Sequence, residues 1–165
     1  MSDVGLGMGG SGFKSLIGMP WTLGKQTVTG PAAGAEWSQT VPPGQLWEIL
    51  EVRYLFVTDA TVVNRTINIR MMNGGSVMVQ VGNPTYQMGG LTRAYRWMTN
   101  FPLFINQVGN ANTPNEMQGP LPDKIIVADG DTILSSTGNL QPGDAYSGID
   151  MIFRRYRNVS RLSFL

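Results

Sequence analysis

Few residues of this sequence have side chains that could carry out covalent or metal chemistry. The 165-residue chain contains no histidine and no cysteine, which excludes thiolate nucleophiles, disulfides, Ser-His-Asp triads, haem ligation and nearly all zinc sites. Glycoside hydrolysis needs two carboxyl groups across a cleft, and Glu48 and Glu51, with their odd spacing on one expected strand, should point to opposite faces. No other combination of the 11 acidic residues stands out. We therefore expect no enzyme activity and no cofactor.

A calcium site is the one metal site that the sequence suggests. Asp129 and Asp131 flank Gly130, and Asp123 or Asp144 could add further oxygen ligands. Calcium takes six to eight oxygens, however, and the local string offers two carboxylates. Because Asp and Gly also favour tight turns, we interpret the motif as a hairpin turn.

The segment Gly5–Gly10 (GLGMGG) formally matches the glycine pattern of dinucleotide-binding proteins. That pattern binds a pyrophosphate only between a buried strand and the start of a helix. Neither element is expected here, so we interpret the segment as part of an extended arm.

The run Arg93–Trp97 (RAYRW) interleaves basic and aromatic residues. Such a run can stack on single-stranded nucleic acid or on sugars. On a strand, Arg93, Tyr95 and Trp97 share one face, and arginine beside aromatic rings is common in ordinary sheets and subunit contacts. We favour the structural interpretation.

The charge balance gives no reason to expect nucleic acid or a membrane as a partner. The formal net charge is +1, too small to attract a polyanion. No stretch reaches the roughly 20 apolar residues of a membrane-spanning helix. The N-terminal MSDVG lacks the basic start of a secretory signal, so we expect synthesis in the cytoplasm.

From about residue 36 the sequence is typical of an antiparallel β protein, with short apolar runs separated by turn signals. The pattern predicts an all-β sandwich of jelly-roll or Greek-key type over residues 36–157. The expected strands are Glu36–Val41, Leu46–Thr58, Val62–Met71, Ser76–Val81, Leu91–Thr99, Leu103–Val108, Lys124–Ala128, Thr132–Ser136 and Ala145–Arg157. The strand Leu46–Thr58 is apolar on both faces, so we expect both faces to be covered.

Residues 1–35 are predicted to form an extended glycine-rich arm, and residues 158–165 a docking tail. The arm sets large apolar side chains among nine glycines. Burying these side chains returns less free energy than ordering about 35 backbone units costs, so we expect a neighbouring molecule to hold the arm. The last fifteen residues carry four arginines and no acid, and they end in Phe-Leu. The expected interface residues are Phe13, Leu16, Ile17, Trp21 and Leu23 in the arm, and Arg154, Arg155, Arg157 and Phe164 near the C-terminus.

In its order of turn and strand segments, the sequence resembles the capsid decoration, or cement, proteins of tailed bacteriophages. The resemblance covers residues 40–157 and is carried by VPPGQLWEIL (41–50), TDATVVNRT (58–66), LPD (121–123), DGDTI (129–133) and PGDAY (142–146). It implies a jelly-roll-like domain on the outer surface of the virion head, often a homotrimer, that clamps neighbouring major capsid proteins.

These observations favour a virion structural protein that acts through several weak contacts. Two alternatives stay open. The chain could be another virion component, such as a head–tail connector, a tail protein or a fibre-base protein. It could also be a carbohydrate-binding module that uses Tyr86, Tyr95 or Trp97.

Overall fold

The computed structural model describes residues 20–100 and 115–157. This part of the chain contains ten strands and no helix. The strands are β1 (Trp21–Val28), β2 (Ser38–Thr40), β3 (Gln45–Val57), β4 (Arg65–Asn73), β5 (Ser76–Gln87), β6 (Thr92–Met98), β7 (Asn115–Pro120), β8 (Ile126–Ala128), β9 (Thr132–Gly138) and β10 (Ala145–Arg157). The expectation of an all-β domain is confirmed.

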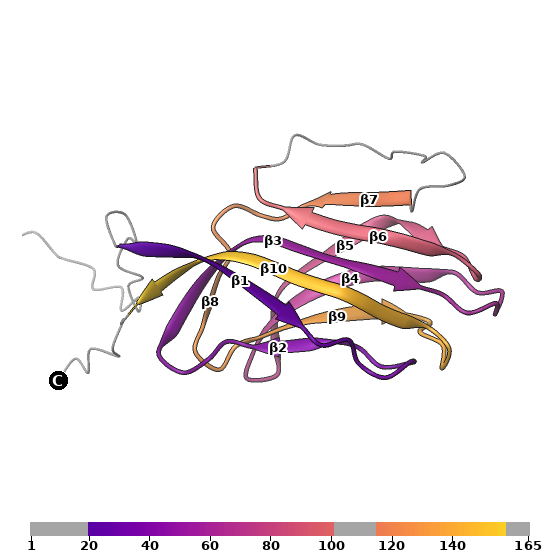
Figure 1. Cartoon of the computed structure of the whole chain (residues 1–165), viewed down its shortest axis with the longest axis horizontal. Coiled ribbons are helices and arrows are strands. Elements are labelled where there is room, and N and C mark those ends of the chain that lie inside the picture. The colour runs from indigo at the N-terminus through magenta and orange to yellow at the C-terminus, as the bar shows by residue number, and fades with distance from the viewer. Residues whose placement is uncertain (1–19, 101–114, 158–165) are drawn as a thin grey trace, which may run out of the picture.

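The strands pair as a nested hairpin that has been rolled into two layers. β1 pairs with β10, β2 with β9, β3 with β6 and β4 with β5, all antiparallel. Two further pairings, β10 with β3 and β9 with β4, complete sheet A (β1-β10-β3-β6-β7, with β8 beside β3) and sheet B (β2-β9-β4-β5). The two sheets lie face to face (Figure 1). This arrangement is a jelly roll, with a parallel strand, β7, added at one edge.

The first strand of the jelly roll lies inside the segment that the sequence predicts to be an arm. β1 pairs with β10 along its whole length, from Trp21 to Val28, and Val28 packs against the core. Gly24 allows a close approach, because a Cβ at this position would lie 2.4 Å from the Phe153 ring. The domain therefore includes residues 21–28 and does not begin at residue 36. The sequence-based comparison for the arm counted only the burial of its side chains. It omitted the backbone hydrogen bonds between β1 and β10, which lie over 120 residues apart in sequence.

Most expected strands are present with shifted ends. β10 has the predicted bounds, whereas β5 runs six residues beyond Val81, and the strand expected from Val62 begins at Arg65. β7 was not expected, because its residues are mostly polar and include Gly119 and Pro120. The strand expected at residues 103–108 lies outside the described residues, as do residues 1–19 and 158–165 of the expected arm and tail.

β3 is apolar on both faces because a β-bulge exchanges its faces halfway along. Glu51 pairs with Ile152 and Ile49 pairs with Phe153, so Leu50 has no partner on β10. Residues of odd number point into the core before the bulge, and residues of even number after it. The buried apolar residues are Trp47 and Ile49 on one side of Leu50, and Val52, Tyr54 and Phe56 on the other. The second apolar face predicted for this strand is therefore largely the same core face.

Candidate docking surface

The structure describes the side chains of four of the nine expected interface residues. Trp21 and Leu23 lie on β1, and Arg154 and Arg155 lie on β10. The remaining expected contacts, Phe13, Leu16, Ile17, Phe164 and the side chain of Arg157, fall outside the described residues.

The register of β1 and β10 brings three of these residues together from opposite ends of the chain. Trp21 lies opposite Tyr156, and Leu23 lies opposite Arg154. Trp21 is 49% exposed and Leu23 is 65% exposed. The Arg154 guanidinium lies 4.9 Å from the centre of the Trp21 ring, in the range of a cation–π contact. The segments before β1 and after β10 therefore both join the sandwich beside this apolar and cationic group.

Arg154 is also held by residues that the sequence did not single out. Its Nη1 donates to Glu48 Oε1 at 3.1 Å, and the Tyr156 hydroxyl donates to Glu48 Oε2 at 2.6 Å. Burial and the hydrogen bond to the Glu48 carboxylate raise the pKa of Tyr156 above its ordinary value. This cluster fixes Arg154 beneath Trp21 and leaves part of its side chain open to solvent.

Arg155 does not join this group. It lies opposite Trp47, a buried core residue, and is itself half-buried. Successive residues of a strand point to opposite faces, so the two neighbouring arginines are divided between the outer and inner faces of sheet A. Whether Arg154 and Arg155 contact a partner stays a prediction.

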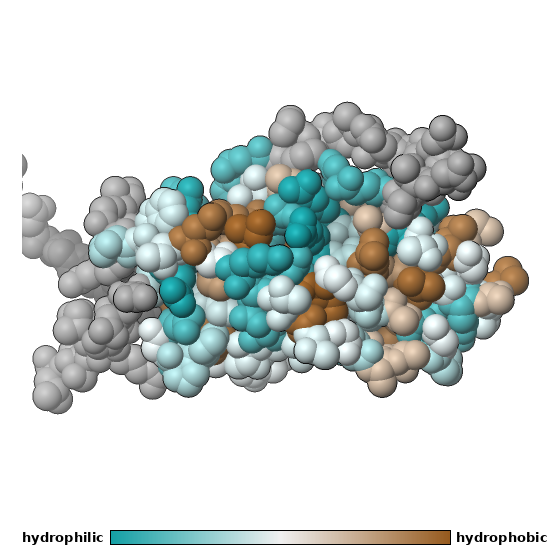
Figure 2. Space-filling view, in the orientation of Figure 1, coloured by the Kyte–Doolittle hydropathy of each residue, from teal (hydrophilic) through white to brown (hydrophobic). Residues whose placement is uncertain are grey.

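Ion pairs cover much of the outer face of sheet A. Asp150 accepts hydrogen bonds from Thr27 at 2.7 Å and from Arg53 at 2.8 Å, and Lys25 approaches it to 3.2 Å. The hydrogen bonds from Thr27 and then from Arg53 lower the pKa of Asp150 to about 2. In Figure 2 the hydrophilic residues form a band across this face, with apolar patches on either side.

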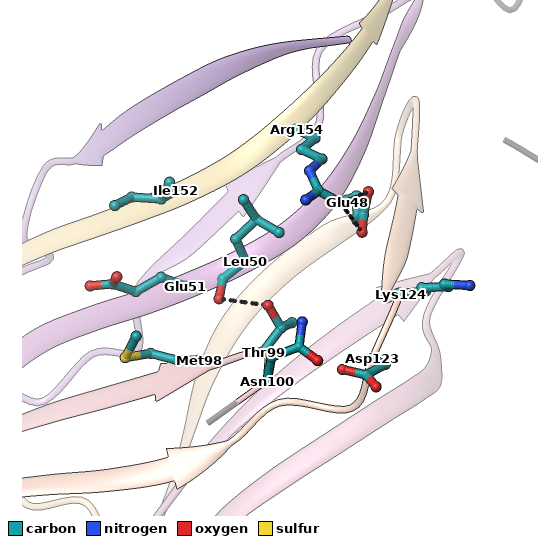
Figure 3. Close-up of a pocket in the computed structure, with 10 residues that line it drawn as sticks. All are labelled: Glu48, Leu50, Glu51, Met98, Thr99, Asn100, Asp123, Lys124, Ile152 and Arg154. Atoms are coloured by element: carbon teal, nitrogen blue, oxygen red, sulfur yellow. Dashed lines mark hydrogen bonds and ion pairs between the residues drawn. The ribbon is translucent and has the colours of Figure 1, made fainter. Parts of the chain in front are cut away.

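The structure also has a hollow of about 460 Å³. It is lined by Glu48, Leu50, Glu51, Met98, Thr99, Asn100, Asp123, Lys124, Ile152 and Arg154 (Figure 3).

The hollow overturns one prediction. Glu48 and Glu51 lie on the same face, because the bulge at Leu50 reverses the expected alternation. Glu48 is bound by Arg154, and both carboxylate oxygens of Glu51 accept hydrogen bonds from Arg96 at 2.9 and 3.0 Å. The hollow is thus lined by apolar side chains and by two glutamates, and each of these carboxylates is already bound to an arginine.

The Asp129–Asp131 motif forms the turn that the sequence favoured. Gly130 has a positive φ of 82°. Asp129 accepts a hydrogen bond from the Gly44 amide at 3.0 Å, and Asp131 accepts one from the Ala128 amide at 2.7 Å. Within residues 20–100 and 115–157, no three acidic side chains gather as metal ligands would.

The RAYRW run follows its structural interpretation. Tyr95 and Trp97 are buried in the core with their rings stacked at 5.6 Å, so neither can bind a sugar at the surface. Tyr86, the third aromatic residue considered for this role, is exposed. The GLGMGG segment lies outside the described residues.

Comparisons with known proteins assign no family. No family model matches the chain, and no curated protein matches it. Among solved structures, a chain from the structure of infectious bursal disease virus, Gt strain, is similar at 13% identity and a TM-score of 0.28. The match covers 88% of this chain and 44% of the viral chain. A TM-score this low does not establish a shared topology. The described part of the chain contains no helix that could span a membrane.

Proposed function

We propose that this chain is a virion structural protein that decorates the outer surface of a tailed-phage head and clamps neighbouring major capsid proteins. In this proposal it acts as a homotrimer, with no catalytic step, no cofactor and no direct contact with nucleic acid. The resemblance of residues 40–157 to decoration proteins supports this proposal, as does the jelly roll. Because one fold serves many functions, the exposed residues of the domain support this function more strongly than the fold does.

The observation that carries the proposal is the meeting of Trp21, Leu23 and Arg154 at the junction of both terminal segments. Exposed aromatic and aliphatic side chains beside an arginine are the usual anchors of a protein interface. Burying each apolar side chain stabilises a complex by about 1.5–3 kcal/mol. Several such contacts, linked in one molecule, raise avidity by a factor of about 10²–10⁴.

The test is binding to heads of the phage that encodes this chain, prepared without it. The full chain should saturate the heads, and W21A/L23A should lower the bound copy number at equal concentration by at least about tenfold. The control is V77A, which trims a half-exposed apolar residue on β5 of sheet B. A truncation must stop at residue 19, because removal of residues 1–35 would also delete β1.

Three results would contradict the proposal. The full chain could fail to bind heads, or both W21A/L23A and the chain without residues 1–19 could bind at unchanged copy number. Low-resolution imaging could also place the protein on a ring of tail symmetry, which would favour a connector or tail protein instead.

A further inference from the structure

Each sheet of the sandwich ends in two strands, and the outer edges of these strands carry backbone groups without a neighbouring strand. Sheet A ends at β1 and β7, and sheet B ends at β2 and β5 (Figure 1). An open edge can pair with a strand from another molecule, so most edges in proteins are short, bulged or interrupted by proline. β1 differs from the other three edges in this respect.

The edges at β2, β5 and β7 have features that oppose further pairing. β2 is only three residues long. β5 has two irregularities in its pairing with β4, and Pro84 lacks the N–H group of a strand residue. β7 has six residues and ends in Gly119 and Pro120. It also contacts β5, so the two sheets meet on this side of the sandwich.

The β1 edge, the side of Trp21–Val28 that faces away from β10, has none of these features. All eight residues of β1 pair with β10 in one unbroken register, and none is proline. In an antiparallel pair, alternate residues point their N–H and C=O groups toward the partner strand, so the other half of β1 points these groups outward. Among the described residues, no backbone hydrogen bond joins β1 to a segment other than β10. The Gln26 side chain donates to one carbonyl, that of Thr27, at 2.9 Å.

The side chains of β1 leave this edge accessible. Trp21 and Leu23 give it exposed apolar surface. A lysine often guards an edge strand, but the Lys25 ammonium lies 3.2 Å from the Asp150 carboxylate on β10. Lys25 therefore leans toward β10 and away from the open edge.

The charges beside the β1 edge do not balance. Two cations, Lys25 and Arg53, share the single carboxylate of Asp150, whereas Arg154 pairs with Glu48. This group of five side chains therefore keeps one positive charge in excess. Interfaces match a surface of one sign with a surface of the other, so the group favours a partner that carries a carboxylate.

We propose that the β1 edge binds an extended, acid-bearing segment of another protein, which adds to sheet A as a strand. An extended backbone presents N–H and C=O groups at the spacing that a strand edge requires. Its side chains on the outer face should be apolar beside Trp21 and Leu23 and acidic beside Lys25. That the segment belongs to a capsid protein rests on the proposed function, whereas the open edge and its charge do not.

The composition of this chain makes its own segments poorer occupants. Residues 1–19 contain one acid and one base, and residues 158–165 contain one arginine and no acid, so neither segment supplies a net negative charge. A second copy of β1 contains no acid either, and it would bring two copies of Lys25 close together. The charge of the edge therefore favours a different protein.

The first test measures amide hydrogen exchange of the full chain by NMR, without phage. Fast and slow amides should alternate along β1. The peptide Thr-Val-Thr-Glu-Thr-Val-Thr, whose side-chain order is the same in both directions, should slow the fast set. With lysine in place of glutamate the peptide should bind at least about threefold more weakly. Lys25→Met should remove most of this difference, whereas the control Arg70→Met, on β4 of sheet B, should preserve it.

The second test uses the phage heads and a variant that lacks one outward N–H group. This variant is Thr22→Pro or Leu23→Pro, whichever amide exchanges faster in the free chain, because proline is tolerated where a strand edge is open. It should lower the affinity for heads by at least about tenfold. Leu23→Ala separates loss of the leucine side chain from loss of the N–H group. The matched control is Val77→Pro or Met78→Pro on the β5 edge, chosen by the same criterion.

Three results would overturn the inference. All amides of β1 could exchange slowly in the free chain, which would mean that the chain covers its own edge. The glutamate peptide could leave β1 unchanged, or the β1 proline variant could bind heads as the wild type does while circular dichroism shows an intact fold. A wild-type chain that binds the glutamate peptide at β1 but binds no heads supports the inference and contradicts only the proposed function.

Discussion

Buried Arg65 binds Asp59, Asp144 and the backbone carbonyls of Thr61 and Val63, a group called here the Arg65 hub. The hub and the ion pairs on the outer face of sheet A use the same kinds of side chain in different surroundings. Arg65 has no exposed surface, whereas the side chains of Arg53, Arg96 and Arg154 are between 36% and 47% exposed. Water screens a charge pair at the surface, and such a pair contributes at most about 1 kcal/mol. A buried pair is costly to desolvate and strongly destabilising when one partner is lost.

The difference teaches what each group of charges does. The hub holds backbone carbonyls on one loop and a carboxylate on another, so its geometry sets the positions of loops that have no ladder of their own. The outer pairs join strands that backbone hydrogen bonds already align. The hub therefore sets the positions of loops, whereas the outer pairs add to strand pairing that the backbone already fixes.

The largest effect should come from removing the buried cation. Arg65→Met should lower the free energy of unfolding by about 3–5 kcal/mol, because it leaves the buried Asp144 carboxylate without a cation. Arg70→Met is the matched control on the same strand, since Arg70 makes a surface hydrogen bond to Gln80. Urea denaturation measures both. Equal losses in the two variants would remove the distinction between the hub and the surface pairs.

A smaller effect is expected at Asp150, the outer carboxylate with the most partners. Asp150→Asn should lower the free energy of unfolding at pH 7 by about 1–2 kcal/mol, because it weakens contacts to β1 and β3 at once. The exposed Asp123→Asn serves as the control in the same denaturation assay. No loss at Asp150 would mean that solvent replaces its partners fully.

The same residue gives the stability a pH dependence of known sign. The pKa of Asp150 is lowered from 3.8 to about 2 in the folded protein, so the unfolded chain takes up the proton first. The stabilisation is complete above about pH 4 and is lost as the pH falls toward 2. The free energy of unfolding, obtained from denaturation curves at several pH values in this window, should change less with pH for Asp150→Asn than for the wild type. Identical slopes would contradict the assignment.

The smallest effect should come from Arg154. Arg154→Ala should cost no more than about 1 kcal/mol, because Arg154 is 39% exposed and the Tyr156 hydroxyl still donates to the buried Glu48 carboxylate when the arginine is removed. Arg154→Lys keeps the charge but loses the planar guanidinium, so it should recover only part of the loss. A larger loss of unfolding free energy, measured by urea denaturation, would mean that this surface cluster stabilises the fold as much as the hub does.

Part of the fold could be read from local patterns. β10 has its predicted bounds, and the Asp129–Asp131 turn forms where Asp and Gly favour it. Other features could not be found in this way. β1 contains a glycine and exposed apolar residues, and it becomes a strand because β10 lies beside it. The bulge at Leu50 has no local signal, yet it places Glu48 and Glu51 on one face.

The sequence by itself determined the all-β class, the absence of histidine and cysteine chemistry, and the basic and apolar character of the C-terminal segment. These properties follow from composition and short-range alternation, which depend on neighbours along the chain. Only the tertiary structure decided that Trp21 meets Arg154, that Arg155 points inward, and that Arg65 joins Asp59 to Asp144. Each of these contacts depends on strand register or burial, and both are set by segments far apart in sequence.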